Sequence, residues 1–98
     1  MARKIRLTKK AEHRFEEILV YLENKFGLSS ATNFVKRTYS FFEVLSEHPQ
    51  IGMLEDTIKG IYGFVLVKQI TVFYRFTDTE VIILNFFDNR MNPDKKSS

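Results

Sequence analysis

The chain has 98 residues, of which 44% are hydrophobic, ten are phenylalanine and none is cysteine. This length and composition predict one folded domain with a hydrophobic core, and they exclude disulfide scaffolds, zinc–thiolate sites and cysteine nucleophiles. The formal net charge of +3 suits a nucleic acid or an acidic protein as a partner.

The first half of the chain predicts a short strand and two helices. Residues 4–7 (KIRL) alternate charged and apolar side chains, as a half-buried strand does. Thr8 stands where a helix N-cap belongs, and apolar residues then recur every three or four positions up to Gly27, a typical helix end. A second apolar stripe follows and stops at HPQIG, because the residue before Pro49 resists helical geometry. Two helices joined by so few residues predict an antiparallel hairpin.

The second half predicts three strands, at 60–69, 70–78 and 79–89, which are rich in valine, isoleucine and aromatic residues. Their short polar junctions favour an antiparallel meander, which the first strand joins to give a four-stranded, mainly antiparallel sheet. We expect the helical hairpin on one face of this sheet, an α+β fold with the order β-α-α-β-β-β. Residues 1–98 would form one domain, with about 91–98 as a loose C-terminal tail.

Alternation along the last two strands assigns their side chains to two faces of the sheet. Ile82, Leu84 and Phe86 are predicted to face the helices, while Phe73, Arg75, Ile83, Asn85 and Phe87 are predicted on the opposite face. A face that combines such rings with Lys68, Arg75 and Arg90 can bind phosphates, stack bases or hold an acidic protein segment. The plainer alternative is that Lys68 sits in a turn and Arg75 only covers the sheet.

Other patterns in the chain indicate little chemistry. His13 and His48 have no spacing typical of a shared metal site, and we expect neither a metal nor a cofactor. The basic start, MARKIRLTKK, is followed by no continuous apolar run, so we expect a cytoplasmic protein without a membrane span. Val20, Tyr21 and Val44 fall outside the apolar stripes of the two helices and are predicted partner contacts, or else isolated exposed residues.

The order of these elements, together with four segments, resembles the RelE/ParE superfamily of toxins from type II toxin–antitoxin modules. The segments are IRLTKKAEHRFEEI, HPQIG, VFYRF and ILNFFDNRMNP, and the resemblance runs from about residue 4 to 95. It implies a growth-inhibiting toxin of a plasmid stabilisation module. A cognate antitoxin would neutralise it by wrapping it with a helix and an extended segment, in a toxin–antitoxin hetero-oligomer. It also implies that Arg75 and Arg90, with Lys68 close by, belong to a basic working face.

The superfamily divides by activity, and the end of this chain favours one branch. RelE-like members cleave messenger RNA on the ribosome without a metal, and commonly use a tyrosine or histidine shortly after the last strand. The segment MNPDKKSS holds neither residue. ParE-like members instead inhibit DNA gyrase by binding. The chain is therefore closer to the ParE-like branch, which predicts a gyrase inhibitor rather than an enzyme.

The candidate site follows from this choice. The predicted target-binding residues are Lys68, Phe73, Arg75, Phe87 and Arg90. If the chain were a ribonuclease, Lys68, Arg75 and Arg90 would stabilise charge, and Tyr74 or Tyr62 would have to transfer the proton. A third reading is a non-toxic binding module that keeps the same fold.

Overall fold

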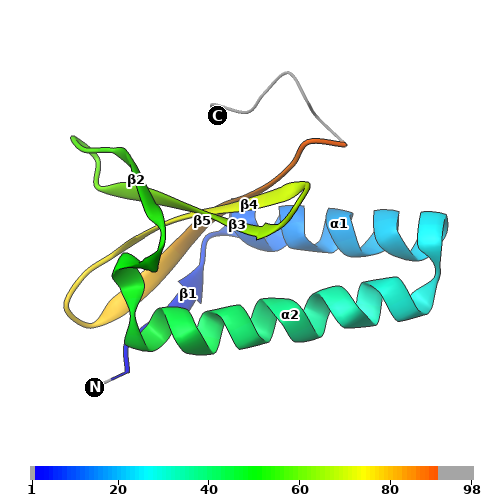
Figure 1. The fold of residues 1–98 in the computed structure, drawn as a ribbon, viewed down its shortest axis with the longest axis horizontal. Coiled ribbons are helices and arrows are strands. Elements are labelled where there is room, and N and C mark those ends of the chain that lie inside the picture. Colours follow the sequence, from blue (N-terminus) through cyan, green and yellow to red (C-terminus); the bar gives the residue numbers. More distant parts are fainter. Residues whose placement is uncertain (1, 91–98) are drawn as a thin grey trace.

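The computed structural model describes residues 2–90, which form a helical hairpin packed on one face of a twisted sheet (Figure 1). In chain order the elements are β1 (Lys4–Leu7), α1 (Lys9–Phe26), α2 (Leu28–Glu47), the short 3-10 helix η1 (Pro49–Ile51), β2 (Met53–Asp56), β3 (Ile61–Val67), β4 (Ile70–Phe76) and β5 (Glu80–Asp88). The α+β class is confirmed, and the predicted strand, two helices and three strands occur in the expected order, with one further strand, β2, before the last three. The expected tail at 91–98 lies outside the described residues.

The sheet has five strands in the order β1-β5-β4-β3-β2, with β1 parallel to β5 and the other neighbours antiparallel. The prediction of four strands is wrong because it missed β2. This strand is exposed along most of its length and carries no apolar alternation, so nothing in its sequence, MLED, resembles a half-buried strand. It is an edge strand, and β1 forms the other edge.

Local chemistry sets the ends of α1. The Thr8 hydroxyl accepts a hydrogen bond from the backbone N–H of Ala11 at 3.1 Å, which is the predicted N-cap. The same hydroxyl donates to the carbonyl of Leu84 at 3.2 Å and so ties the start of the helix to β5. Gly27 ends the helix with φ of +100°, a backbone conformation that strains any residue with a side chain. The tight reversal into α2 therefore depends on this glycine.

The core lies between the helical hairpin and the sheet. Phe15 of α1 packs against Phe34 of α2 and Phe86 of β5, with ring centroids 5.7 and 5.3 Å apart. Most of the predicted helical stripe is buried or partly buried, but Phe26 is exposed because α1 extends beyond the sheet at its last turn. The stripe therefore identified the buried face of the helix, except at its end.

A β-bulge in β5 changes which of its side chains face the helices. Phe73 lies opposite Asn85 and Tyr74 lies opposite Ile83, so Leu84 is an extra residue with no partner on β4. Ile83 therefore belongs to the core, whereas Ile82 lies opposite Arg75 and outside the core cluster. The predicted positions of Ile82 and Ile83 were exchanged, because strict alternation holds only where no residue is inserted.

Candidate functional site

The sheet face turned away from the helices is called the outer face here. Its side chains, assigned from strand register and from the core, include Lys4, Arg6, Thr71, Phe73, Arg75, Ile82, Asn85 and Phe87. Arg6 on β1 and Arg75 on β4 both lie opposite Ile82 of the central strand. Two guanidinium groups thus flank one buried isoleucine, and Lys4 is two residues away on β1.

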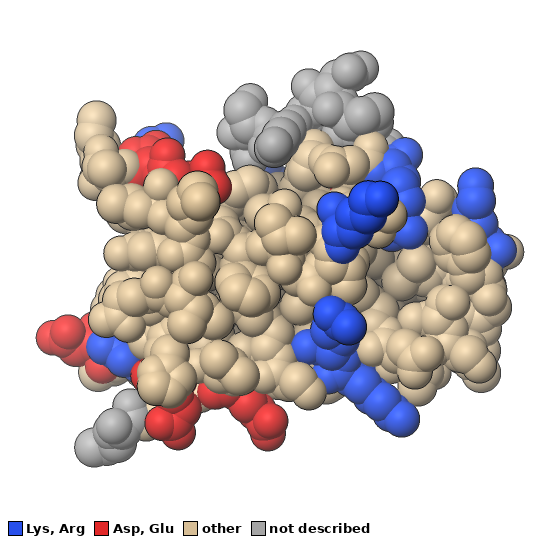
Figure 2. All heavy atoms as spheres, in the orientation of Figure 1, with Lys and Arg blue, Asp and Glu red and all other residues tan. Residues whose placement is uncertain are grey.

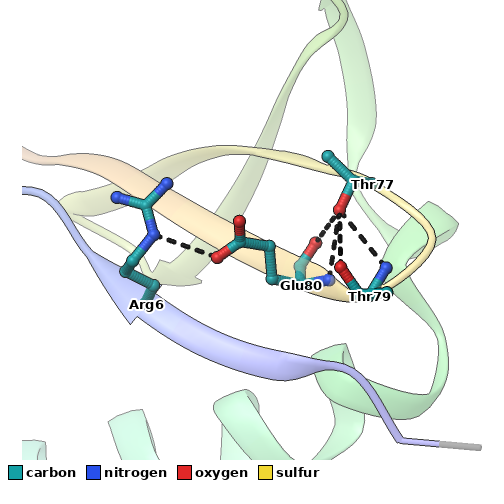
Figure 3. A network of polar contacts seen from close by, with 4 residues as sticks. All are labelled: Arg6, Thr77, Thr79 and Glu80. Carbon is teal, nitrogen blue, oxygen red and sulfur yellow. Dashed lines mark hydrogen bonds and ion pairs between the residues drawn. The ribbon is translucent and has the colours of Figure 1, made fainter.

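Of the two arginines, Arg6 is balanced by a carboxylate of the described part of the chain and Arg75 is not. Nε of Arg6 lies 3.0 Å from Oε1 of Glu80, and Figure 3 shows this pair beside the turn in which Thr77 Oγ1 accepts from the backbone N–H groups of Thr79 and Glu80. Arg75 is exposed and forms no ion pair within residues 2–90. Arg75 and Lys4 are therefore uncompensated charges at this end of the outer face within residues 2–90.

Aromatic and amide groups continue the outer face along β4 and β5. Phe73 is partly buried, and Asn85 lies directly opposite it. Only 5% of Asn85 is exposed, yet its side-chain oxygen has no hydrogen-bond donor in the described part of the chain. An unpaired buried amide oxygen costs about 1–3 kcal/mol. Asn85 is thus an acceptor that a bound partner can satisfy.

Arg75 is distant from the other two predicted basic residues. Lys68 lies in the β3–β4 turn, and the backbone N–H of Asn89, just after β5, donates to the carbonyl of Gln69 in that turn at 2.9 Å. Ile70 and Arg75 stand at opposite ends of β4, roughly 17 Å apart at about 3.3 Å per residue. The prediction that Lys68, Arg75 and Arg90 lie together on one face is therefore wrong.

Arg90 leaves the sheet towards the helices instead of joining the outer face. Its Nε and Nη2 donate to the two carboxylate oxygens of Asp88 at 3.1 and 3.0 Å, and its backbone N–H donates to Asp88 Oδ1 at 2.9 Å. The guanidinium carbon lies 5.3 Å from the centre of the Tyr21 ring on α1. The hydrogen bonds to Asp88 raise the pKa of Arg90 above its ordinary value. Arg90 thus neutralises a carboxylate of which 2% is exposed, and it ties the end of β5 to α1.

Tyr74, the predicted proton-transfer residue of a nuclease, is part of the core. None of its surface is exposed, and its hydroxyl donates to the Pro49 carbonyl at 2.7 Å and accepts from Gly52 N–H at 2.9 Å. Burial raises the pKa of this hydroxyl. Tyr62 stacks on the Tyr74 ring at 5.7 Å and packs against the same core. The suggestion that either tyrosine serves the outer face is therefore corrected, because both lie on the helix side of the sheet.

The comparison with known protein families decides the class of the chain. A family model described as ParE toxin of type II toxin-antitoxin system, parDE, matches residues 5–93. The chain belongs to the ParE toxin family. It is 25% identical over 87 residues to Toxin ParE1 of Caulobacter vibrioides, which spans 89% of this chain and 90% of that protein.

Solved structures with the same fold accompany this ParE family match. A chain of the chromosomal ParDE toxin–antitoxin system from P. aeruginosa has a TM-score of 0.72 at 17% identity, covering 89% of this chain and 96% of that one. A chain of the toxin–antitoxin complex RelBE2 from Mycobacterium tuberculosis has a TM-score of 0.60 at 21% identity, covering 90% and 99%. At these identities the solved structures establish the shared fold.

The predicted partner contacts of this ParE-family chain lie on the helices. Val20 is 56% exposed and Val44 is 49% exposed, whereas Tyr21 is partly buried beneath the Arg90 guanidinium. Sequence reasoning missed a larger apolar feature beside the β1 edge. A groove of about 590 Å³ runs between β1 and α2, and its lining residues are Arg3, Ile5, Leu7, Tyr39, Phe42, Glu43 and Ser46.

Three charged residues of the outer face were also missed from the sequence. Lys4 and Arg6 alternate with apolar residues in KIRL, and this signal was sufficient to place both on one face. Glu55 lies on the same side, because a side chain built at Gly63 would meet its Cγ at 3.1 Å and the Phe73 ring at 3.2 Å. No sequence signal revealed Glu55, since β2 itself was missed.

No group of histidine, aspartate and glutamate side chains within residues 2–90 is arranged to hold a metal ion. Neither α1 nor α2 combines the length and the hydropathy that a bilayer-crossing helix requires.

Proposed function

We propose that this chain is the growth-inhibiting toxin of a type II toxin–antitoxin pair and that it inhibits DNA gyrase by binding. The observation that carries the proposal is the ParE family match over residues 5–93, on a chain whose outer face presents cations and rings. A plasmid that encodes such a pair would be retained, because a cell that loses the plasmid loses the antitoxin before it loses the toxin.

The chemistry of the outer face supports binding. Arginine cannot give up its proton near neutral pH, so Arg6 and Arg75 can attract anions but cannot act as a general base. The tyrosines that could exchange a proton, Tyr62 and Tyr74, lie on the helix side of the sheet. An exposed guanidinium beside a partly buried ring, that of Phe73, is instead typical of a surface that holds an anionic or amide-rich partner. Arg75 and Phe73 are the proposed centre of this surface. Phe87, also predicted as a target contact, lies opposite Thr71 on the same face, but only 5% of it is exposed.

A ribonuclease of the RelE type is the second candidate, and Glu55 is the observation that favours it. Its carboxylate lies close to Gly63, next to Phe73, on the face that also holds Arg75. A carboxylate and a guanidinium on one face can together accept a proton and stabilise a phosphorane. A ribonuclease would therefore need Glu55 to accept the proton, because Tyr74 is buried in the core and cannot do so.

The antitoxin is the proposed partner in the cell, and the β1 edge is its proposed docking place. An extended segment could pair with the free edge of β1 and insert apolar side chains into the groove beside Tyr39 and Phe42. Basic Lys4 and Arg6 on that strand suit an acidic segment. A helix of the antitoxin could cover Val20 and Val44.

Expression of the chain with and without its antitoxin tests the toxin role. We expect growth arrest only when the antitoxin is absent. Arg75→Ala should relieve the arrest, while Lys9→Ala, a matched loss of one exposed cation at the start of α1, should not. Unchanged thermal denaturation of both variants is the control for folding. Full growth with the unaltered chain alone would instead indicate a non-toxic binding module.

Two assays separate the proposed targets. Purified protein at micromolar concentration should inhibit supercoiling by DNA gyrase, and Arg75→Ala should weaken that inhibition. Toe-printing of a translated message should show intact RNA during growth arrest. Cleavage within codons that Glu55→Gln abolishes would replace the gyrase proposal with the ribonuclease. Unaltered supercoiling together with intact message would exclude both targets.

Three substitutions locate the antitoxin surface. Tyr39→Ser should weaken antitoxin binding if the β1 groove is used, and Val20→Ser or Val44→Ser should do so if the outer sides of the helices are covered. Calorimetric titration of each variant with the antitoxin measures the difference. If none of the three changes affinity, the antitoxin binds elsewhere.

A further inference from the structure

A second hollow, separate from the outer face and from the β1 groove, lies where the helical hairpin meets the β3–β4 turn. Its volume is about 240 Å³, and its lining residues are Leu22, Ser30, Asn33, Phe34, Arg37, Val67, Gln69, Ile70 and Arg90. The floor is apolar, because Leu22, Phe34 and Ile70 belong to the hydrophobic core. The polar side chains that line the hollow come from α2, from the β3–β4 turn and from the end of β5. This hollow is called the hairpin pocket below.

Hydrogen-bond donors surround this apolar floor. Ser30, Asn33 and Arg37 are spaced at three and four residues on α2, so they lie on one side of the helix. Arg37 is exposed, and its only hydrogen bond within residues 2–90 is one of 3.4 Å from Nη1 to the Leu66 carbonyl. Across the hollow, Asp88 occupies Nε and Nη2 of Arg90 and leaves Nη1 without an acceptor in the described part. Two guanidinium groups therefore have N–H donors available at one small cavity.

The charge around the hairpin pocket is positive. Figure 2 shows lysine and arginine side chains gathered mainly on the half of this face where α2 begins and the β3–β4 turn lies, whereas acidic side chains gather on the other half. Asp88 is the one carboxylate bonded to a pocket residue within residues 2–90, and Arg90 already neutralises it. Arg37 thus contributes an unbalanced positive charge.

We propose that the hairpin pocket binds a short acidic segment of a protein partner. One carboxylate of the segment would lie between Arg37 and Arg90, and a neighbouring apolar side chain would pack on the floor. A carboxylate matches the paired N–H donors of a guanidinium. This site is distinct from the outer face, so the proposal stands whether or not gyrase is the target.

The floor argues against a nucleic acid as the occupant. Single-stranded nucleic acids bind proteins by stacking bases on exposed aromatic faces along an extended basic groove. The one ring that lines the hairpin pocket, Phe34, is 6% exposed and packs against Phe15 inside the core. A cavity of about 240 Å³ fits one or two side chains better than a run of nucleotides. An amphipathic acidic peptide satisfies both the apolar floor and the cationic sides.

NMR titration of the full, isotope-labelled chain with the dipeptide N-acetyl-Leu-Glu-amide tests this proposal. Backbone amides of Ser30, Asn33 and Gln69 should shift on binding, and those around Arg75 should not. Arg37→Gln should weaken binding about five- to tenfold, as expected for the loss of a charge-assisted contact near the surface. Lys36→Gln is the matched control, because it removes one positive charge from the adjacent position, which does not line the pocket. It should change affinity less than about twofold.

Three further probes complete the test. N-acetyl-Leu-Gln-amide, which lacks the negative charge, should bind clearly more weakly than the glutamate peptide. Inorganic phosphate and the oligonucleotide dT4 should shift the same amides less at equal concentration. Equal losses for Arg37→Gln and Lys36→Gln would overturn the proposal in favour of unspecific charge attraction. Tighter binding of dT4 would assign the pocket to nucleic acid, and an absence of shifts at these amides would exclude a peptide site.

Discussion

The hydroxyl of Tyr74 provides the sharpest test of the boundary between core and site. Tyr74→Phe removes one oxygen and leaves the ring, so the packing against the core persists. The lost groups are two hydrogen bonds, of 2.7 Å to the Pro49 carbonyl and of 2.9 Å from Gly52 N–H. These bonds hold η1 and the start of β2 against the sheet.

The size of the effect follows from these two bonds. Each buried hydrogen bond contributes about 0.5–1.5 kcal/mol net, so the substitution should cost about 2 kcal/mol of unfolding free energy. For a domain of this size, a loss of that magnitude lowers Tm by roughly 8–16 °C. Tyr62→Phe is the matched control, since the hydroxyl of Tyr62 makes no hydrogen bond within residues 2–90, and it should change Tm by less than about 3 °C.

Urea and thermal denaturation of the purified variants measure the loss, and growth inhibition is scored at a temperature where both stay folded. We expect Tyr74→Phe to remain a toxin there, because its hydroxyl supports the backbone and does not face a target. A Tm equal to that of the parent chain would refute the structural role of the bridge. Abolished toxicity in a variant that is still folded would show that Tyr74 takes part in the chemistry after all.

Three further outcomes are expected. Burial raises the pKa of the Tyr74 hydroxyl above the unfolded value of about 10. The neutral hydroxyl therefore contributes fully to stability below that pH, and this contribution is lost as the pH rises through the folded pKa. The urea midpoint should accordingly fall more steeply above about pH 10 in the parent chain than in Tyr74→Phe. Asp88→Asn should lower the unfolding free energy by about 2 kcal/mol, measured by urea denaturation, because it removes a buried partner of Arg90; an unchanged midpoint would contradict that. The losses of target affinity caused by Arg75→Ala and Lys68→Ala should add within about 0.5 kcal/mol in the double variant, since Lys68 precedes β4 and Arg75 stands near its other end, about 17 Å from Ile70. Strong coupling would mean that the two residues contact the target as one group.

The helical half of the fold was predictable because its signals are local. The Thr8 cap, the Gly27 stop and the apolar stripes each depend on a few neighbouring residues, and the structure has α1 and α2 where these signals place them. The strands β3, β4 and β5 were predictable for a similar reason, since each is apolar and bounded by short polar turns. The strand β2 was not, because an exposed edge strand needs little apolar sequence.

The faces of the sheet were harder to predict than its strands. One inserted residue, Leu84, reverses the alternation of β5, and no composition signal marks it. The direction of Arg90 depends on Asp88 and Tyr21, which come together only in the folded chain. Residues within one undisturbed strand, such as Phe73 and Arg75 on β4, were assigned correctly to one face. The candidate site was therefore predictable only where it lies within regular pairing.

The position of Arg90 changes which charges are available for binding. Asp88 balances Arg90 at the end of β5, and Glu80 balances Arg6 beside β1, so neither arginine adds its full charge to the surface field. Arg75 and Arg37 have no such carboxylate in the described part of the chain, and they lie on different faces of the molecule. Binding at one of them therefore leaves the other accessible. A toxin of this shape can hold an acidic partner segment in the hairpin pocket while its outer face remains free for a target, and loss of one interaction through Arg37→Gln or Arg75→Ala should leave the other intact.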